Sequence, residues 1–252
     1  MNIITTNDFY EISIMDELAI LEIKEKVFEL ITDVNLSGKL VEFLNGIDHN
    51  PDIKGLVLFN RPESLNEEQY DNFISRVCDI KEIGEKGEKP CFKEKNARFR
   101  EINILNTLIR NLANLQTLVF AGINGTVVTP FIGTALVADF RYASEDAVLS
   151  MIHNKYHLHP SGGLPFFLSK LLHHSKALEV QMSERIDAQE ALSLGLVSKL
   201  LPKEDFKNKL IIEAKKFTKL NYCTIRDTKR LTNFNRQSLN EYFELEAGLL
   251  NL

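Results

Sequence analysis

Residues 118–125 read LVFAGING, a run of apolar side chains that ends in Asn-Gly. A continuous apolar run of this length predicts a strand buried on both faces, and Asn-Gly predicts a tight turn after it. Two further segments follow, ADFRYASEDA at 138–147 and RIDAQEALSLGLVSK at 185–199. The first predicts two short strands around a polar turn, and the second predicts a helix followed by a strand. Together the three segments indicate an α/β fold.

Toward the N-terminus strands and helices also alternate. The first 35 residues predict strands, at 9–14 and 18–23, and a helix is expected to begin at Ser37. The apolar run 55–59 predicts another buried strand, so a strand, a helix and a strand form a crossover unit. A helix is predicted from Asn66 through Ile83.

The stretch from Lys81 to Arg100 is strongly charged, with both signs interleaved. Interleaved charges are typical of a solvated surface, so we expect an exposed loop over 84–97. Beyond Pro160 the chain predicts helices almost throughout, with one strand over 197–201. Neither an internal repeat nor a linker interrupts the pattern. We therefore expect one structural domain, with a core over 1–200 and a helical C-terminal region over 201–252.

The bulk composition narrows the class of protein. The chain has 252 residues, 44% of them apolar, and a formal net charge of -5. That balance gives no electrostatic reason to expect nucleic acid or an anionic membrane as a partner. Three scattered cysteines without CxxC spacing predict reduced thiols rather than a disulfide or zinc site. Neither a secretory leader nor a long apolar run is found, so a cytoplasmic, soluble protein is expected.

Residues 118–202 resemble the crotonase (enoyl-CoA hydratase/isomerase) superfamily. That family has a strand into Asn-Gly, a glycine-rich turn and helix, an Asp before the next strand, and later A-x-E-A-x-x-x-G-L-V. The same order occurs here, and the last pattern matches residues 188–197. The resemblance implies a spiral of ββα units with a helical C-terminal part, shorter here than is usual. It also implies trimers or hexamers and a coenzyme A thioester as substrate or ligand, with no other cofactor required.

The resemblance also implies where the chemistry would be placed. Members of the family hold the thioester oxygen with two backbone N–H groups and move protons with one or two glutamates. The first N–H comes from a Gly-Gly-Gly turn, which matches Thr129-Pro130-Phe131 here, and Pro130 has no N–H to donate. Counting along the motifs places Gly133 and His153 at the two glutamate positions. Such losses, at about 10²–10³ per donor and 10²–10⁴ per acid or base, would abolish ordinary hydration.

The second N–H donor of the family follows the strand that matches residues 55–59. Here the sequence reads SLNEEQ at 64–69, and Gln69 is the best match for the donor. Ser64, Leu65 and Asn66 are the matching candidates for contact with coenzyme A. The acidic side chains of this loop are expected to repel the phosphates of that ligand.

Two functions remain open from the sequence. In the first, the chain is a non-standard enzyme on an acyl thioester, with His153 and either Tyr156 or His157 transferring protons. In the second, it is a non-catalytic subunit that binds an acyl-carrier protein or assembles with an active paralogue. His153 and His157 would share a helix face, but the H-E-x-x-H pattern is absent and Pro160 favours a loop. No metal site is therefore predicted.

Overall fold

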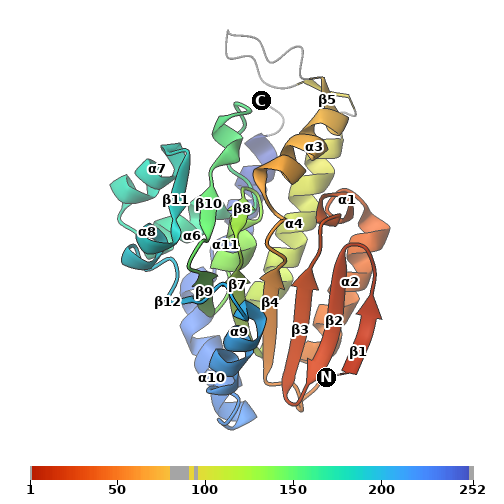
Figure 1. Cartoon of the computed structure of the whole chain (residues 1–252), viewed down its shortest axis with the longest axis vertical. Helices are drawn as coiled ribbons and strands as arrows, with labels where there is room; N and C mark the ends of the chain where they lie inside the picture. Colours follow the sequence, from red (N-terminus) through yellow and green to blue (C-terminus); the bar gives the residue numbers. More distant parts are fainter. Residues whose placement is uncertain (1, 80–90, 94–95, 250–252) are drawn as a thin grey trace.

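The computed structural model describes residues 2–79, 91–93 and 96–249. Its main sheet has the strand order β1-β2-β3-β4-β7-β9-β12. The strands are β1 (Asn2–Thr6), β2 (Tyr10–Met15), β3 (Leu18–Ile23), β4 (Gly55–Asn60), β7 (Leu118–Ile123), β9 (Phe140–Ser144) and β12 (Lys199–Leu201). The first three strands pair antiparallel, and β3, β4, β7, β9 and β12 pair parallel (Figure 1).

A second sheet stands beside the first and has the order β11-β10-β8. Its strands are β8 (Thr126–Val128), β10 (Val148–Ser150) and β11 (Arg185–Asp187). Consecutive strands thus divide between the sheets: β7 and β9 lie in the main sheet, whereas β8 and β10 lie in the second. Each such pair is followed by a helical segment, which produces the predicted repetition of ββα units. A short pair of strands, β5 (Cys78–Asp79) and β6 (Cys91–Phe92), extends from the rest.

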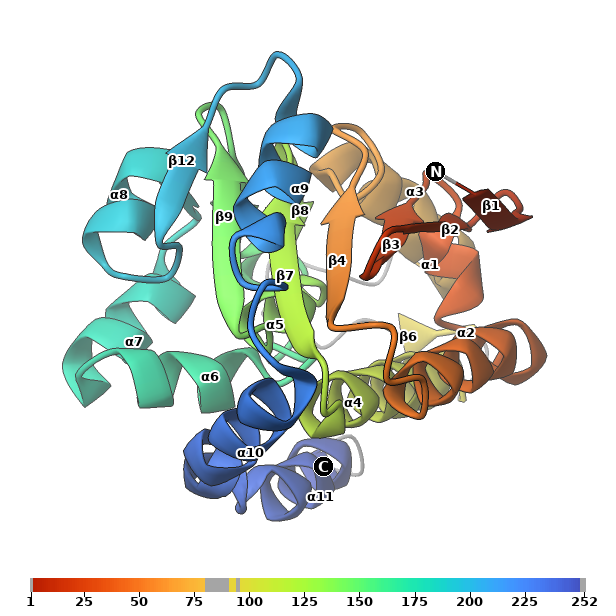
Figure 2. The ribbon, with the colours of Figure 1, turned by 90° about the horizontal axis from the view of Figure 1, so that it is seen from below.

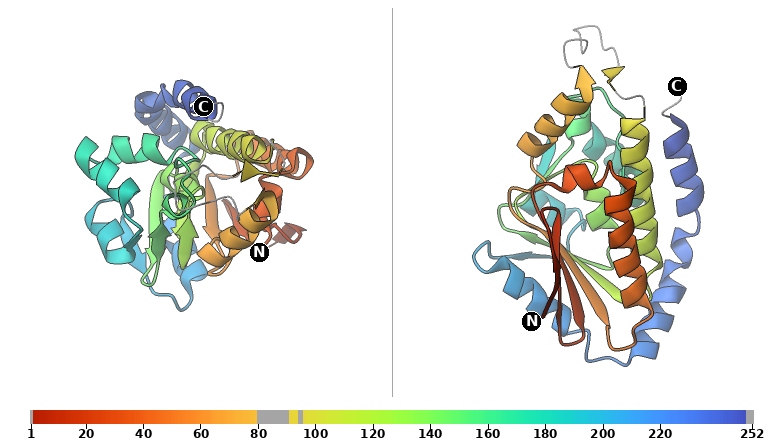
Figure 3. Two further views of the ribbon diagram at one scale, coloured as in Figure 1. Left: turned by 90° about the horizontal axis from the view of Figure 1, so that it is seen from above. Right: turned by 90° about the vertical axis from the view of Figure 1, so that its right-hand side faces the viewer.

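Helices cover both faces of the main sheet. They are α1 (Val27–Leu30), α2 (Val34–Asp48), α3 (Glu67–Val77), α4 (Ala97–Asn114), α5 (Ile132–Leu136), η2 (Ile152–Asn154), α6 (Leu164–Leu171), α7 (His174–Met182), α8 (Ala188–Ser193), α9 (Phe206–Lys215), α10 (Tyr222–Thr232), η3 (Asn233–Arg236) and α11 (Leu239–Gly248). The helix α9 packs on one face, against Val57, Phe59 and Phe120. The helices α2 and α4 lie on the opposite face (Figure 2). In Figure 3, α2, α4 and α11 lie side by side.

The strand and helix predictions are confirmed for most of the chain. Strands 18–23 and 118–123 occur with the predicted bounds. The prediction of strands through residue 35 is wrong at its end, because α1 and α2 begin there. The carboxylate of Asp33 accepts the N–H groups of Asn35 and Leu36, so α2 begins at Val34, three residues before the predicted start.

Two other predictions need correction. The helix predicted through Ile83 ends at Val77, since Cys78 and Asp79 already have extended backbone and form β5. Residues 80–83 and most of the predicted loop 84–97 lie outside the described residues. The sequence pattern did not reveal the short strands β1, β8 and β11. Each of them has only three to five residues, too few for an alternating pattern to be distinct.

Candidate functional site

Three segments meet at the end of the main sheet and bring most of the predicted site residues together. The loop after β4 joins the end of β8 through the N–H of Val128, which donates to the carbonyl of Leu65 at 3.0 Å. The segment after β8 joins the one after β10 through the N–H of Thr129, which donates to the carbonyl of Ser150 at 3.0 Å. Residues 64–66, 129–133 and 151–163 therefore form one continuous site.

Gly133 is packed tightly against the turn that precedes α6. A Cβ atom on Gly133 would overlap the carbonyl oxygen of Gly162, and a Cβ on Gly162 would overlap the carbonyl of Pro130. The backbone at Gly162 and Gly163 has φ values of +69° and +70°, which glycine adopts without strain. At Gly133, which motif counting matches to the first glutamate of the family, there is consequently no space for any side chain.

His153 is buried, with 3% of its surface exposed. Its Nδ1 lies 3.1 Å from the hydroxyl of Thr129, and its ring also hydrogen-bonds to the backbone of Gln181. Burial is the main cause that lowers the pKa of His153 to about 4, and the positive charge of Arg98 lowers it further. The imidazole is therefore neutral at physiological pH and has hydrogen-bond partners within the protein.

The other two candidate proton-transfer residues have different surroundings. The hydroxyl of Tyr156 donates to Oδ1 of Asp71 at 2.6 Å, and burial together with this carboxylate raises the pKa of Tyr156. Lys155 forms an ion pair with the same Asp71 at 2.8 Å. His157 is exposed and has a φ of +51°. The structure therefore does not bring His157 together with His153 and Tyr156 inside the protein.

The predicted thioester contacts on the loop after β4 are engaged in local hydrogen bonds. The N–H of Gln69 donates to the side chain of Asn66 at 2.9 Å, which caps the N-terminus of α3. Ser64 is fully buried, and its hydroxyl donates to the carbonyl of Arg61 at 2.9 Å. In this conformation Gln69 and Ser64 serve the fold of the loop.

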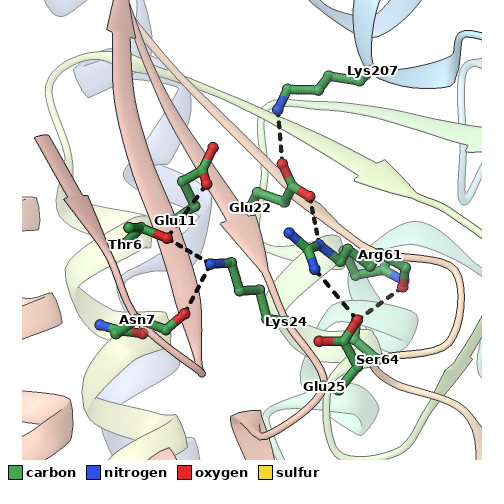
Figure 4. A network of polar contacts seen from close by, with 10 residues as sticks. Thr6, Asn7, Glu11, Glu22, Lys24, Glu25, Arg61, Ser64 and Lys207 are labelled. Carbon is green, nitrogen blue, oxygen red and sulfur yellow. Dashed lines mark hydrogen bonds and ion pairs between the residues drawn. The ribbon is translucent and has the colours of Figure 1, made fainter. Parts of the chain in front are cut away.

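A network of ion pairs fixes the start of this loop to the rest of the protein. Arg61 pairs with Glu22 at 2.8 Å and with Glu25 at 3.6 Å. Lys207 on α9 reaches the other oxygen of Glu22 at 2.7 Å (Figure 4). Because its guanidinium is already paired with two carboxylates, Arg61 contributes little positive charge toward a ligand phosphate.

Aromatic side chains fill the space beside Pro130. The rings of Phe28, Tyr70, Phe73, Phe131 and Tyr156 pack with centroid distances of 5.2–6.0 Å, and all five are buried. Behind them lies an apolar cavity of about 70 Å³. Leu65 and Phe131 line the cavity next to the site, and most of the remaining lining comes from β3, β4, β7, α1, α2, α4 and α5.

On the other side of the Gly162 turn lies a set of buried charges that the sequence reasoning missed. Nη1 of Arg98 is 2.8 Å from Oε1 of Glu101, and both side chains are at most 5% exposed. The carboxylate of Glu246, on α11, accepts the N–H groups of Gly162 at 2.8 Å and Gly163 at 3.2 Å. Arg98 belongs to a stretch that was expected to be solvated, and that expectation is wrong for this residue.

Burial dominates the protonation of this set. It raises the pKa of Glu246 to about 7, although the two backbone N–H groups and the charge of Arg98 act in the opposite direction. Tyr242 hydrogen-bonds to the same carboxylate, and burial raises the pKa of its hydroxyl. Perturbed pKa values cluster at functional sites and also occur in structural ion-pair networks, so the geometry of the set has to decide between these roles.

Metal ligands and membrane spans concern the described ranges 2–79, 91–93 and 96–249. No group of three or more His, Cys, Asp or Glu side chains in these ranges is arranged to hold a metal ion. None of the helices described there has the length and hydropathy that a membrane span requires.

Comparison with known proteins gives a consistent result. The model of the enoyl-CoA hydratase/isomerase family matches residues 33–251. A probable enoyl-CoA hydratase of Mycobacterium tuberculosis is 28% identical over 190 residues, which cover 63% of this chain and 66% of that protein. The mitochondrial methylglutaconyl-CoA hydratase of Mus musculus is 31% identical over 101 residues, 40% of this chain and 32% of that protein. The matches thus span less than two thirds of these relatives.

Solved structures share the fold over nearly the whole chain. An enoyl-CoA hydratase from Bacillus halodurans superposes with a TM-score of 0.76 and 16% identity, covering 96% of this chain and 93% of that one. DspI of Pseudomonas aeruginosa superposes with a TM-score of 0.75 and 19% identity, covering 98% and 91%. These likenesses confirm the predicted crotonase-like fold. On the match to the family model over residues 33–251, the chain belongs to the enoyl-CoA hydratase/isomerase family.

Proposed function

We propose that the chain binds an acyl thioester and is not an ordinary hydratase. The observation that carries this proposal is the stacking of Gly162 on Gly133, because it leaves no space for a carboxylate at the first glutamate position. Pro130 lacks the N–H that an oxyanion would need, and His153 is neutral and buried. The surrounding residues pack closely against Gly133 and His153, so neither position has room for an added carboxylate.

An acyl group remains the best-supported ligand. Family membership favours a thioester, and the apolar cavity ends at Leu65 and Phe131, next to the segment where the thioester carbonyl would bind. Apolar walls favour a hydrocarbon chain over a polar substituent. We further propose that the protein forms a homo-trimer or hexamer, in keeping with the resemblance.

Calorimetric titration with CoA, acetyl-CoA and crotonyl-CoA tests this proposal, together with a hydration assay on crotonyl-CoA. We expect micromolar binding of the thioesters and no hydration above the background rate. Leu65→Asp should weaken binding of crotonyl-CoA more than binding of CoA, whereas the exposed Leu245→Asp should leave both unchanged. Absence of binding at millimolar thioester, or rapid hydration by the native protein, would contradict the proposal.

A second candidate is a non-catalytic subunit that binds an acyl-carrier protein or an active paralogue. The observation that favours it is the aromatic set Phe28, Tyr70, Phe73, Phe131 and Tyr156, which fills the space beside the lost amide donor. This candidate predicts that free acyl-CoA does not bind while an acylated carrier protein does. The same titrations, repeated with acyl-carrier protein, therefore separate the two candidates.

A further inference from the structure

Three buried polar residues behind the Gly162 turn are incompletely satisfied. Nε of Arg98, Oε2 of Glu101 and Oγ of Ser161 are buried and have no hydrogen-bond partner among the described residues. Together with Glu246 these residues form what we name the Arg98–Glu246 cluster. Buried polar atoms in folded proteins nearly always have partners, and exceptions mark bound water, a ligand or a catalytic role. The cluster therefore has two unused donors and one unused acceptor inside the protein.

The backbone segment 159–163 lies between the two ends of this cluster. Nη2 of Arg98 donates to the carbonyl of His159 at 3.2 Å, and Glu246 accepts from Gly162 and Gly163. Ser161 lies on this segment, between the two contact points, and only 1% of its surface is exposed. The unused atoms thus belong to groups held around one short stretch of backbone.

Segment 159–163 contacts Gly133, the residue that motif counting matches to the family's first glutamate. Gly162 touches Gly133 through its carbonyl and hydrogen-bonds Glu246 through its N–H. A single residue thus separates the carboxylate of Glu246 from the backbone of Gly133. Gly133 on α5 has no carboxylate, but the carboxylate of Glu246 on α11 lies one residue away from it, although α11 comes more than 100 residues later in the chain.

We propose that the Arg98–Glu246 cluster is the proton-transfer site of this protein, with Glu246 as the acid and base. The proposal rests on the proposed binding of an acyl thioester. The Glu246 carboxylate removes a proton from the carbon next to the thioester carbonyl: the C–H bond breaks, an O–H bond forms on Glu246, and the electron pair moves onto the carbonyl oxygen. The N–H of Arg98 and the hydroxyl of Ser161 donate to that oxygen, and return of the proton restores the thioester.

A purely structural role for Glu246 explains its two hydrogen bonds to the turn, but it leaves the three unused atoms unexplained. Because burial raises the pKa of Glu246 to about 7, both protonation states that the transfer needs are populated at neutral pH. Glu101 pairs with Arg98 and holds its guanidinium in place, so we assign it a positioning role. Only Gly162 separates the Glu246 carboxylate from Gly133, so the cluster lies next to the segment where the thioester carbonyl is proposed to bind.

The experiment is incorporation of deuterium from D₂O into the methyl group of acetyl-CoA, followed by NMR. We expect the native protein to catalyse the exchange, with a rate that rises with pH and levels off above about 7. Glu246→Gln should lower the rate at least about 100-fold. Glu244→Gln, an exposed glutamate on the same helix, should leave it unchanged.

A variant that fails to fold would not decide the matter, so Ser161→Ala is the second test. Removal of a donor to the oxyanion should lower exchange about 100-fold while the circular dichroism spectrum stays native. If the native protein binds acetyl-CoA in calorimetry but catalyses no exchange, the proton-transfer proposal is overturned and the binding proposal stands. If both Glu246→Gln and Ser161→Ala exchange at the native rate, the cluster has no catalytic role. Without binding, both proposals fail.

Discussion

At Pro130, Gly133 and His153, the residues that motif counting matches to the family's catalytic positions, the chain is closed: no side chain fits at Gly133, and His153 is hydrogen-bonded to Thr129 and Gln181. At the Arg98–Glu246 cluster, a few residues away, charges are buried and three polar atoms lack partners among the described residues. The first region has the features of a structural core and the second has those of a functional site. The difference teaches that a segment matched to a family's catalytic positions can be packed as core while titratable groups lie buried beside it.

The largest expected effect is on the free energy of unfolding when Gly133 is substituted. Gly133→Ala should destabilise the protein by about 4 kcal/mol or more, because the added Cβ overlaps the carbonyl of Gly162. Gly46→Ala is the matched control, since it is also a helical glycine but has no atom within 4 Å of the added carbon. That substitution should stabilise the protein by roughly 1 kcal/mol. Urea unfolding of the two variants measures both values, and equal effects would contradict the packing described here.

Breaking the buried ion pair should have the next largest effect. Arg98→Met leaves the buried carboxylate of Glu101 without compensation and should cost about 3–5 kcal/mol. Arg76→Met breaks the exposed pair with Glu29 and should cost less than about 1 kcal/mol. The double variant Arg98→Met with Glu101→Met should recover most of the loss. If Arg98→Met is as mild as Arg76→Met in urea unfolding, the guanidinium is not buried as described.

The Glu246 carboxyl should give the protein a distinctive pH dependence. Burial raises its pKa from 4.5 to about 7, so folding favours the protonated form. Its contribution to stability is complete below pH 4.5 and is lost as the pH rises from 4.5 to 7. The size of that loss is about 3 kcal/mol. Urea unfolding of the native protein and of Glu246→Gln across this range should show a difference that changes with pH. A constant difference would mean that Glu246 titrates normally.

The smallest effect is expected at His157, outside both regions. Its backbone has a φ of +51°, which costs a residue with a Cβ about 1 kcal/mol. His157→Gly should therefore stabilise the protein by about that amount and leave deuterium exchange unchanged. A drop in thermal stability or in exchange would show that this side chain makes contacts that matter.

Local patterns were sufficient for most of the fold. The apolar runs at 18–23 and 118–123 have strong periodic signals, and both strands occur with the predicted bounds. Counting along the motifs also assigned Pro130, Gly133 and His153 to the family's site positions, and this assignment stays a prediction. The predicted contacts of Gln69 and Ser64 with a thioester stay predictions; in the structure the N–H of Gln69 donates to Asn66 and the hydroxyl of Ser64 donates to the carbonyl of Arg61.

The Arg98–Glu246 cluster had no local signal. Arg98 stands in a stretch of alternating charges, which is typical of solvated surface, and its burial follows from how α4 packs against segment 159–163. Glu246 meets Gly162 across 84 residues of sequence, so no spacing rule connects them. Only the tertiary structure brings these groups to the position next to Gly133.

The most direct test compares His153→Ala with Glu246→Gln in the deuterium exchange of acetyl-CoA, across pH 5 to about 9. The two variants separate the site expected from sequence from the one that the structure indicates. Our account predicts that His153→Ala keeps most of the exchange and its rise toward pH 7, and that Glu246→Gln loses both. Loss of exchange in His153→Ala with normal exchange in Glu246→Gln would contradict the account and return proton transfer to the family's own position.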